Sequence, residues 1–226
     1  MIRVLSTLAV MGAMRDIAQR FEAETGTKVT AEFAPTVALL ERLRAGEAAD
    51  VAILTAQGID DLTLDGVIRA GSRTDVAISF VGVAVKAGTP KPDIATVEAF
   101  TGSLLAARSV AYSRIGASGL FFAGLIERLG IAAEVNARAT IVASGFTAER
   151  LGTGEADIAI QQISELLVVP GIEVVGPLPP DVQATAMFSA GILIASGQSA
   201  EPFLRFLASP AIAPILRKAG LEPAAG

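Results

Sequence analysis

The chain of 226 residues contains neither cysteine nor histidine, and each absence excludes a class of chemistry. Without cysteine there are no disulfides, no thiolate metal ligands and no thiol nucleophile. Without histidine the commonest general base and metal ligand is missing, which excludes a serine–histidine hydrolase and a histidine zinc site. We therefore expect no metal and no cofactor, and any acid or base must be Asp, Glu, Lys, Tyr, Arg or water.

Aromatic residues and basic clusters are also scarce. Aromatic residues make up 5% of the chain, tryptophan is absent and Tyr112 is the only tyrosine, whereas 52% of the residues are hydrophobic. The core must therefore consist of Ala, Val, Leu and Ile, a composition that suits close packing of helices on a sheet. The net charge of −5 comes without a basic cluster, so the electrostatic signature of nucleic-acid binding is missing.

The first residues resemble a secretory leader, because "MIRVLSTLAVMGAMRD" combines a basic residue, an apolar run and small residues. The pattern of a buried strand at Ile2–Ser6 and an amphipathic helix near 10–24, ending at Gly26, is stronger. We therefore expect this segment to belong to the fold and the chain to carry no leader. The location would be periplasmic if a leader was removed and cytoplasmic if the chain is natively leaderless. No apolar run reaches membrane-spanning length without charges, so no membrane insertion is expected.

Apolar strands alternate with amphipathic helices along the chain, which predicts an α/β fold with mainly parallel sheets covered on both faces. The expected strands are Ile2–Ser6, Lys28–Phe33, Val51–Thr55, Val76–Ala84, Ser109–Ser113, Ala139–Val142, Ile158–Gln161, Ile172–Gly176 and Ala186–Ala195. The expected helices lie near 10–24, 37–46, 57–65, 119–129, 147–153 and 200–218. Such sheets bind ligands at the carboxyl ends of their strands.

Two long strands suggest a division into lobes. "AISFVGVAVKAGTPKPDIAT" is a long strand followed by a Gly/Pro-rich passage, and "AMFSAGILIASG" is the later strand of comparable length. If both strands cross between lobes, the first lobe contains residues 1–83 and 186–226 and the second contains residues 84–185. One continuous sheet is the alternative that periodicity leaves open.

Short polar side chains follow several of the expected strands. Ser6 and Thr7 follow the first strand, Thr36 precedes the next helix, and Gln161 and Gln162 follow the seventh strand. Serine and threonine at these places cap helices, which is the simpler explanation for any one of them. Together they predict a pocket of hydroxyls, amides and helix N-termini that suits a bound anion.

The segment "VAYSRIGASGLFFAGLIERLG" adds a cation to this pattern. Arg114 lies in the loop between a strand and a helix, and a guanidinium can bind a carboxylate with two parallel hydrogen bonds. Gly116 and Gly119 would let the backbone approach a ligand closely. A solvated loop arginine is the competing interpretation.

Over essentially its whole length the chain resembles the periplasmic molybdate-binding protein family, the ModA-like type II solute-binding proteins. The resemblance lies in "IRVLSTLAVMGAMRDIAQRFEAETGTKV", "FAPTVALLERLRAGEAADVAIL", "VGVAVKAG", "GASGLFFAGLIERLG" and "GEADIAI", in their order and spacing. It implies two α/β lobes joined by two crossover strands, with an anion held in the cleft between the lobes. Relatives of this family also isomerise aconitate, a tricarboxylate.

Matched to the family, the site residues are partly altered. Thr36 keeps a hydroxyl where the family has its second-loop serine, whereas Ala9 stands in place of the first-loop serine. Ser118 and Gly145 match positions that supply backbone amides, and Gln162 replaces a tyrosine that the family uses as a ligand donor. These changes, together with the added arginine, favour an organic di- or tricarboxylate over molybdate.

Three functions follow from this interpretation. The favoured one is a binding protein that delivers a small anion to the permease of an ABC-type membrane transporter. The second is an isomerase of an unsaturated polycarboxylate, which requires a base near the reacting carbon, with Tyr112, Glu165 and Lys86 as candidates. The third is a ligand-sensing domain like the effector domains of LysR-type regulators, although the chain has no helix-turn-helix segment.

Overall fold

The computed structural model describes residues 1–196 and 200–224 and divides into two compact units. Unit 1 comprises Met1–Ser79 and Ala186–Gly226, and unit 2 comprises Phe80–Thr185. The sequence placed the first boundary four residues later, after residue 83, and the second at the same position; residues 197–199 and 225–226 of the expected first lobe lie outside the described residues. That each unit is an independent domain stays a prediction.

Unit 1 is a mixed sheet with helices on both of its faces. Its strands are β1 (Ile2–Thr7), β2 (Val29–Ala34), β3 (Val51–Thr55), the first half of β4 (Thr74–Lys86), β9 (Thr185–Ile192) and β10 (Glu222–Pro223). Its helices are α1 (Met11–Thr25), α2 (Thr36–Arg44), α3 (Ala56–Leu64), α9 (Glu201–Leu207) and α10 (Ala213–Lys218), with short 3₁₀ turns at Leu8–Val10 and Pro210–Ile212. Strand β1 lies between β2 and β3 and is parallel to both, whereas β9 pairs antiparallel with β3.

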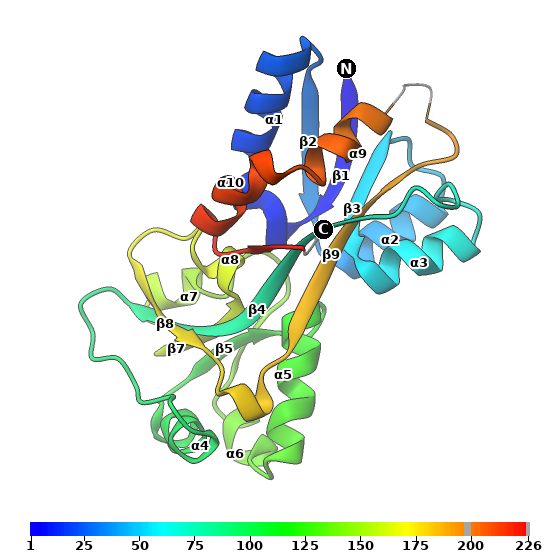
Figure 1. Ribbon diagram of the computed structural model, residues 1–226. Helices are drawn as coiled ribbons and strands as arrows, with labels where there is room; N and C mark the ends of the chain where they lie inside the picture. Colours follow the sequence, from blue (N-terminus) through cyan, green and yellow to red (C-terminus); the bar gives the residue numbers. More distant parts are fainter. Residues whose placement is uncertain (197–199, 225–226) are drawn as a thin grey trace. The chain divides into compact units, whose positions relative to one another are not determined.

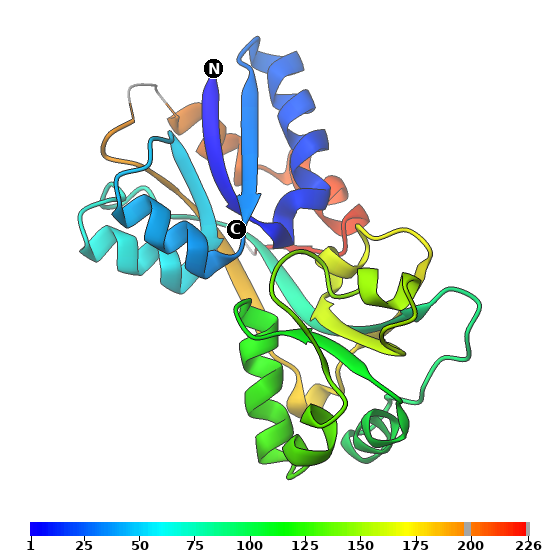
Figure 2. The same ribbon diagram turned by 180° about the vertical axis from the view of Figure 1, so that it is seen from behind.

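The alternation along β1 builds two cores in unit 1. Val4 packs into a cluster with α1, α9 and α10, whereas the next residue, Leu5, packs with α2 and α3 on the other face. Phe21 of α1 contacts Phe203 of α9 edge to face, with their ring centroids 5.1 Å apart. Helices α1 and α10 lie side by side in both views (Figures 1 and 2), so the two ends of the chain share one core.

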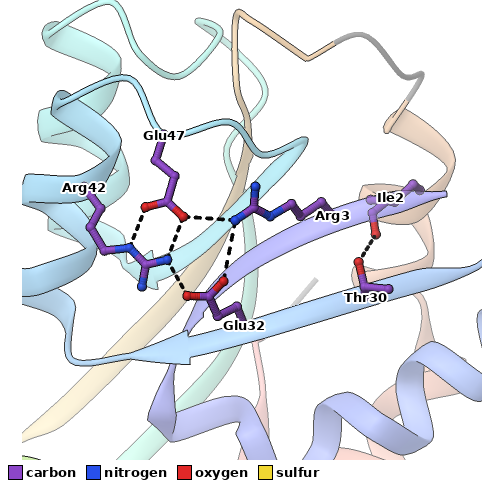
Figure 3. A network of polar contacts seen from close by, with 6 residues as sticks. All are labelled: Ile2, Arg3, Thr30, Glu32, Arg42 and Glu47. Atoms are coloured by element: carbon purple, nitrogen blue, oxygen red, sulfur yellow. Dashed lines mark hydrogen bonds and ion pairs between the residues drawn. The ribbon is translucent and has the colours of Figure 1, made fainter.

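A network of four charged side chains joins β1, β2 and α2 on the surface of unit 1 (Figure 3). Arg42 donates to both carboxylate oxygens of Glu47, over 2.6 and 2.7 Å, and also to Glu32. Arg3 donates to Glu47 over 3.0 Å and forms an ion pair with Glu32. The hydrogen bonds from Arg42 hold the pKa of Glu47 below its usual range. Because these groups are partly exposed, the network orients the loop before β3 more than it stabilises the unit.

Unit 2 repeats the arrangement around a second sheet. Its strands are the second half of β4, β5 (Val110–Ser113), β6 (Thr140–Val142), β7 (Ile158–Gln162) and β8 (Ile172–Pro177). Its helices are α4 (Val97–Ala106), α5 (Ala117–Arg128), α6 (Ala132–Asn136), α7 (Glu149–Gly152) and α8 (Ile163–Leu166), with a 3₁₀ turn at Pro180–Val182. Strand β5 is parallel to β6 and β7, whereas β4 pairs antiparallel with β7 and β8.

The two faces of the unit 2 sheet differ in the size of their side chains. Val, Ile and Tyr112 pack against α4, α5 and α6, whereas Ala84, Ala111 and Ala159 face α7 and α8. The small residues let the short helices α7 and α8 approach the sheet closely. The expected α/β class is thus confirmed, but the sheets are mixed and not mainly parallel, because the long strands β4 and β9 pair antiparallel with their neighbours. Among the described residues, no helix combines the length and the apolar character needed to cross a bilayer.

Two expectations about helices are wrong. The helix expected at 200–218 is interrupted, because α9 ends at Leu207 and Pro210 begins a 3₁₀ turn before α10 starts. Helix α4 lies just after the Gly/Pro-rich passage, where no helix was expected. It begins at Val97 and is capped by Thr96, whose hydroxyl accepts the backbone N–H of Ala99 at 3.1 Å. The polar and small residues of α4 weaken the apolar periodicity from which a helix is predicted.

Gly119 lies inside α5 and allows this helix to pack closely against β5. It is the third residue of α5, and a Cβ atom there would lie 1.8 Å from the carbonyl oxygen of Ser113, the last residue of β5. Only a residue without a side chain lets the first turn of α5 rest on the end of β5. This contact sets where the β5–α5 loop, including Arg114, is placed.

We therefore expect Gly119→Ala to lower the free energy of unfolding by about 3 kcal/mol, since the added methyl group meets immobile backbone. Gly102→Ala is the matched control, because Gly102 lies inside α4 with no atom within 4 Å of the added Cβ. That variant should be neutral or more stable by up to about 1 kcal/mol through helix propensity. Urea unfolding measures both, and equal effects would contradict the assigned contact.

Candidate functional site

In unit 1, the predicted ligand residues gather at the carboxyl ends of β1 and β2. Thr7 and Ala34 are paired across the two strands, so both strands end at the same level. Ser6 and Thr7 are buried, and the hydroxyl of Ser6 donates to the carbonyl oxygen of Thr7 over 3.2 Å. Thr36 is the first residue of α2 and is half-buried. Three hydroxyl groups therefore occupy one edge of this sheet.

Helix capping does not account for these hydroxyls. Thr7 precedes a 3₁₀ turn but forms no side-chain cap, and Thr36 lies inside α2 rather than at its capping position. Thr55 is a true cap in this unit, because its hydroxyl accepts the N–H of Gly58 at 3.2 Å. The hydroxyls of Thr7 and Thr36 therefore do not cap helices.

In unit 2, the other four predicted ligand residues also share one edge. Arg114 and Ser118 follow β5, Gly145 follows β6, and Gln162 is the last residue of β7. Since β6 and β7 are both parallel to β5, all three strands end on the same side of the sheet. The structure therefore brings Arg114, Ser118, Gly145 and Gln162 to a common edge of unit 2.

Arg114 is exposed and lies over the side chain of Tyr112, with its guanidinium carbon 5.9 Å from the ring centroid. Its Nε and Nη2 atoms donate to the Tyr112 hydroxyl, each over 3.3 Å, and Nη2 also lies 3.3 Å from Oδ1 of Asn136. Among the described residues, no carboxylate forms an ion pair with Arg114. The guanidinium is thus held in place by neutral groups and keeps its charge available for an anion.

Ser118 supplies both a buried hydroxyl and a backbone donor. It is the second residue of α5, whose capping position is Gly116 without a side-chain cap. The N–H groups in the first turn of a helix have no acceptor within that helix. The side chain of Ser118 is 5% exposed, so the residue lies at the buried end of the β5–α5 loop.

Gln161 fixes the loop that contains Gly145. Its Oε1 accepts the backbone N–H of Thr147 at 2.8 Å and the Thr147 hydroxyl at 3.0 Å, and its Nε2 donates to the carbonyl of Gly145 over 3.4 Å. Gly145 has φ +80°, a left-handed conformation that other residues rarely adopt. The sequence predicted Gln161 as one of the amides of an anion pocket, whereas here its side chain bonds within the protein and orders the loop after β6. A polar residue closing the apolar strand "IAIQQ" was the available signal.

Gln162 has a buried polar atom without a partner. The residue is 3% exposed, and its Oε1 forms no hydrogen bond with any described residue. Buried side-chain polar atoms nearly always have a partner, so such an exception marks a place where a water or a ligand completes the structure. Because the oxygen and nitrogen of an amide are assigned from their surroundings, either end of this side chain can meet a ligand.

Glu165 is a buried carboxyl group directly beyond these glutamines. It is the third residue of α8, is 8% exposed, and lies next to the backbone N–H of Gln162 and the side-chain amide of Gln161. Burial raises the pKa of Glu165 to about 7, and the two hydrogen-bond donors only partly offset this rise. Both protonation states are therefore populated near neutral pH.

The other two candidate bases are placed less favourably. The Tyr112 hydroxyl donates to Oδ1 of Asn136 over 2.5 Å and accepts from Arg114, and its side chain is fully buried. Lys86 ends β4 beside a cavity of about 500 Å³, which is also lined by Arg108 and Asp157. These residues precede β5 and β7, so Lys86 lies at the opposite edge of the unit 2 sheet.

The raised pKa of Glu165 predicts a pH-dependent stability. Because the folded-state pKa of about 7 lies above the ordinary value of 4.5, the folded state binds the proton more tightly, and this contribution is lost as the pH rises through 7. Between pH 5 and 8 the wild type should lose about 2 kcal/mol more unfolding free energy than Glu165→Gln. Urea titrations at both pH values measure this, and an equal loss in the two proteins would contradict the assignment.

Comparison with known proteins agrees with the fold. Residues 2–222 match the family model described as bacterial extracellular solute-binding protein. An aconitate isomerase from a Pseudomonas species is 34% identical over 231 residues, covering 98% of this chain and 87% of that protein. The periplasmic molybdate-binding protein of Azotobacter vinelandii has the same fold, with a TM-score of 0.82, 20% identity and 98% of each chain covered. Peb3 of Campylobacter jejuni also matches, with a TM-score of 0.73, 15% identity and coverage of 98% and 99%. The chain belongs to the family of bacterial extracellular solute-binding proteins, with the ModA-like fold that its sequence predicts.

Proposed function

We propose that the protein binds a small unsaturated polycarboxylate of the aconitate type and isomerises it. The observation that carries the proposal is Arg114, a guanidinium that pairs with no carboxylate of the described residues and lies at the edge where three parallel strands end. A carboxylate is the anion whose planar geometry matches this side chain best. Several carboxylates on one ligand suit the further donors at the same edge, namely the amides of Ser118 and Gly145.

The relative supports the reaction as well as the ligand. The Pseudomonas aconitate isomerase is similar to this chain over nearly its whole length, so the kinship covers both units. A second solved structure of PEB3 holds L-phospholactate, a small organic anion that carries a carboxylate and a phosphate group. A compact dianion such as molybdate requires an enclosing cage of hydroxyls and amides. This chain has Gln162 and Arg114 beside the strand ends instead, and these groups suit an extended ligand.

The hydroxyl groups of unit 1 are a second set of proposed hydrogen-bond donors. Thr36 matches the family's second-loop serine, and Ser6 and Thr7 lie near the first-loop position, which Ala9 occupies. Thr7 and Thr36 have hydroxyls without capping bonds that can donate to carboxylate oxygens. Thr36→Val preserves shape and removes the hydroxyl, so it tests this part of the assignment separately from Arg114.

A receptor that delivers a carboxylate to an ABC-type transporter is the second candidate function. It is favoured by the family, whose description is that of extracellular solute-binding proteins. In this case the protein would act in the periplasm and contact a membrane permease. The receptor and the isomerase share the binding site and differ only in whether the bound ligand reacts.

A thermal-shift panel with product analysis tests the proposal. The panel compares molybdate, tungstate, sulfate and phosphate with citrate, malate, cis-aconitate and trans-aconitate. A ligand at about one hundred times its dissociation constant should stabilise the fold by about 2.7 kcal/mol, a rise of roughly 5 to 10 °C. We expect shifts with the unsaturated tricarboxylates and conversion of one aconitate isomer to the other. A shift with molybdate alone would contradict the proposal, and binding without conversion would favour the receptor.

Arg114→Ala should weaken aconitate binding by about 1.5 to 3 kcal/mol, because it removes a charge-assisted hydrogen bond. Arg128→Ala is the matched control, since Arg128 is an exposed arginine in the last turn of α5. Isothermal titration calorimetry measures both variants. Affinity equal to that of the wild type in Arg114→Ala would remove Arg114 from the site.

A further inference from the structure

Glu165 combines features that packing alone does not explain. Its side chain is buried in unit 2, yet no charged side chain contributes to the pKa of its carboxyl group. A buried carboxylate without a cation is costly, whereas an apolar side chain can be buried without such a cost. A carboxyl group kept in this position therefore calls for a role that an apolar side chain cannot perform.

The surroundings of Glu165 place it beside the proposed ligand donors. It follows Gln162 by three residues, and the backbone N–H of Gln162 is one of its two hydrogen-bond donors. Gln162 in turn has the buried Oε1 atom that lacks a partner. Because side chains alternate along β7, the Gln162 side chain points away from the face on which Gln161 and α8 lie. The two faces meet at the carboxyl end of β7, where a ligand that completes the hydrogen bonding of Gln162 would also lie next to Gln161, the side chain that contacts Glu165.

The second donor, Gln161, gives Glu165 a fixed orientation. The Gln161 side chain is itself held by Thr147 and by the carbonyl of Gly145, so it cannot turn away from the carboxyl group. Gln161 therefore acts as a positioning residue for Glu165. It also connects Glu165 to the loop after β6, at the edge where the other proposed donors lie.

We infer that Glu165 is the catalytic acid–base group that moves the proton in the isomerisation. This inference rests on the proposed function. The Glu165 carboxylate takes one proton from the methylene carbon next to the double bond, and the electron pair left behind spreads over the three-carbon allylic unit into the adjacent carboxylate. The protonated Glu165 carboxyl group, whose proton exchanges with solvent, then gives a proton to the carbon at the other end of the unit, and the double bond shifts by one carbon. No oxidant, reductant or water is consumed.

Other residues at the same strand ends can stabilise the charge that develops in this step. Negative charge grows on a substrate carboxylate as the proton leaves, and Arg114 with the backbone amide of Ser118 can stabilise it. A pKa near neutrality lets Glu165 accept the proton and return it with little cost in either direction. In a chain without histidine, burial of a carboxyl group is one way to obtain such a pKa.

The test compares wild type, Glu165→Gln and Glu165→Asp with aconitate in deuterium oxide, followed by proton NMR. Glu165→Gln should slow both isomerisation and deuterium incorporation at least about 100-fold. Its thermal shift with the same ligand should stay close to that of the wild type, which shows that the variant is folded and binds. Glu149→Gln is the control, because Glu149 is an exposed carboxylate near Gly145 and should react like the wild type.

The pH profile separates a catalytic role from a structural one. In the wild type, kcat/KM should rise with pH and level off above about 7, because the base must be deprotonated. Glu165→Asp should retain part of the activity with a displaced profile, which a merely structural residue would not produce. An active wild type with turnover in Glu165→Gln within threefold of it would overturn only the role of Glu165. A wild type that neither isomerises nor exchanges deuterium would overturn the proposed function, and this inference with it.

Discussion

Parallel strands end at a common edge of their sheet, and this constraint decides where polar side chains can gather in the protein. In unit 1 the ends of β1 and β2 bring hydroxyl groups together, and in unit 2 the ends of β5, β6 and β7 bring together Arg114, Ser118, Gly145 and Gln162. Elsewhere the strands are lined by apolar residues that pack under helices on both faces. The polar side chains are thus confined to the strand ends, while the interior of each unit is apolar.

Close packing in unit 2 then determines the electrostatics of the edge. Alanines on one face of the sheet let α7 and α8 lie near it, and Glu165 is buried as a consequence of its place in α8. Burial, and not a neighbouring charge, raises the pKa of Glu165 to about 7. Arg114, by contrast, is exposed, and its guanidinium donates to the neutral side chains of Tyr112 and Asn136, so its positive charge is not neutralised by them. Unit 2 thus combines an exposed cation held by neutral groups with a buried carboxyl group whose pKa is raised.

The sequence predicted the features that depend on local patterns. Continuous apolar runs located the strands within a few residues. The polar residues that follow them, such as Arg114 and Gln162, were predicted to lie together because the carboxyl ends of parallel strands coincide, and their role in ligand binding stays a prediction. Features that depend on distant packing could not be predicted. The burial of Glu165, the bond from Gln161 to Thr147 and the contact of Gly119 with Ser113 all join segments whose distance no pattern reveals. The interruption at Pro210 was a local signal that was overlooked.

A crystal structure of the protein grown with trans-aconitate tests the central claim most directly. The account predicts a substrate carboxylate bound to the guanidinium of Arg114, another at the amides beside Gln162, and a substrate carbon within reach of a Glu165 carboxylate oxygen. It also predicts that Oε1 or Nε2 of Gln162 gains a hydrogen bond. Aconitate bound elsewhere, for example in the cavity beside Lys86, with Arg114 and Glu165 untouched, would contradict the account.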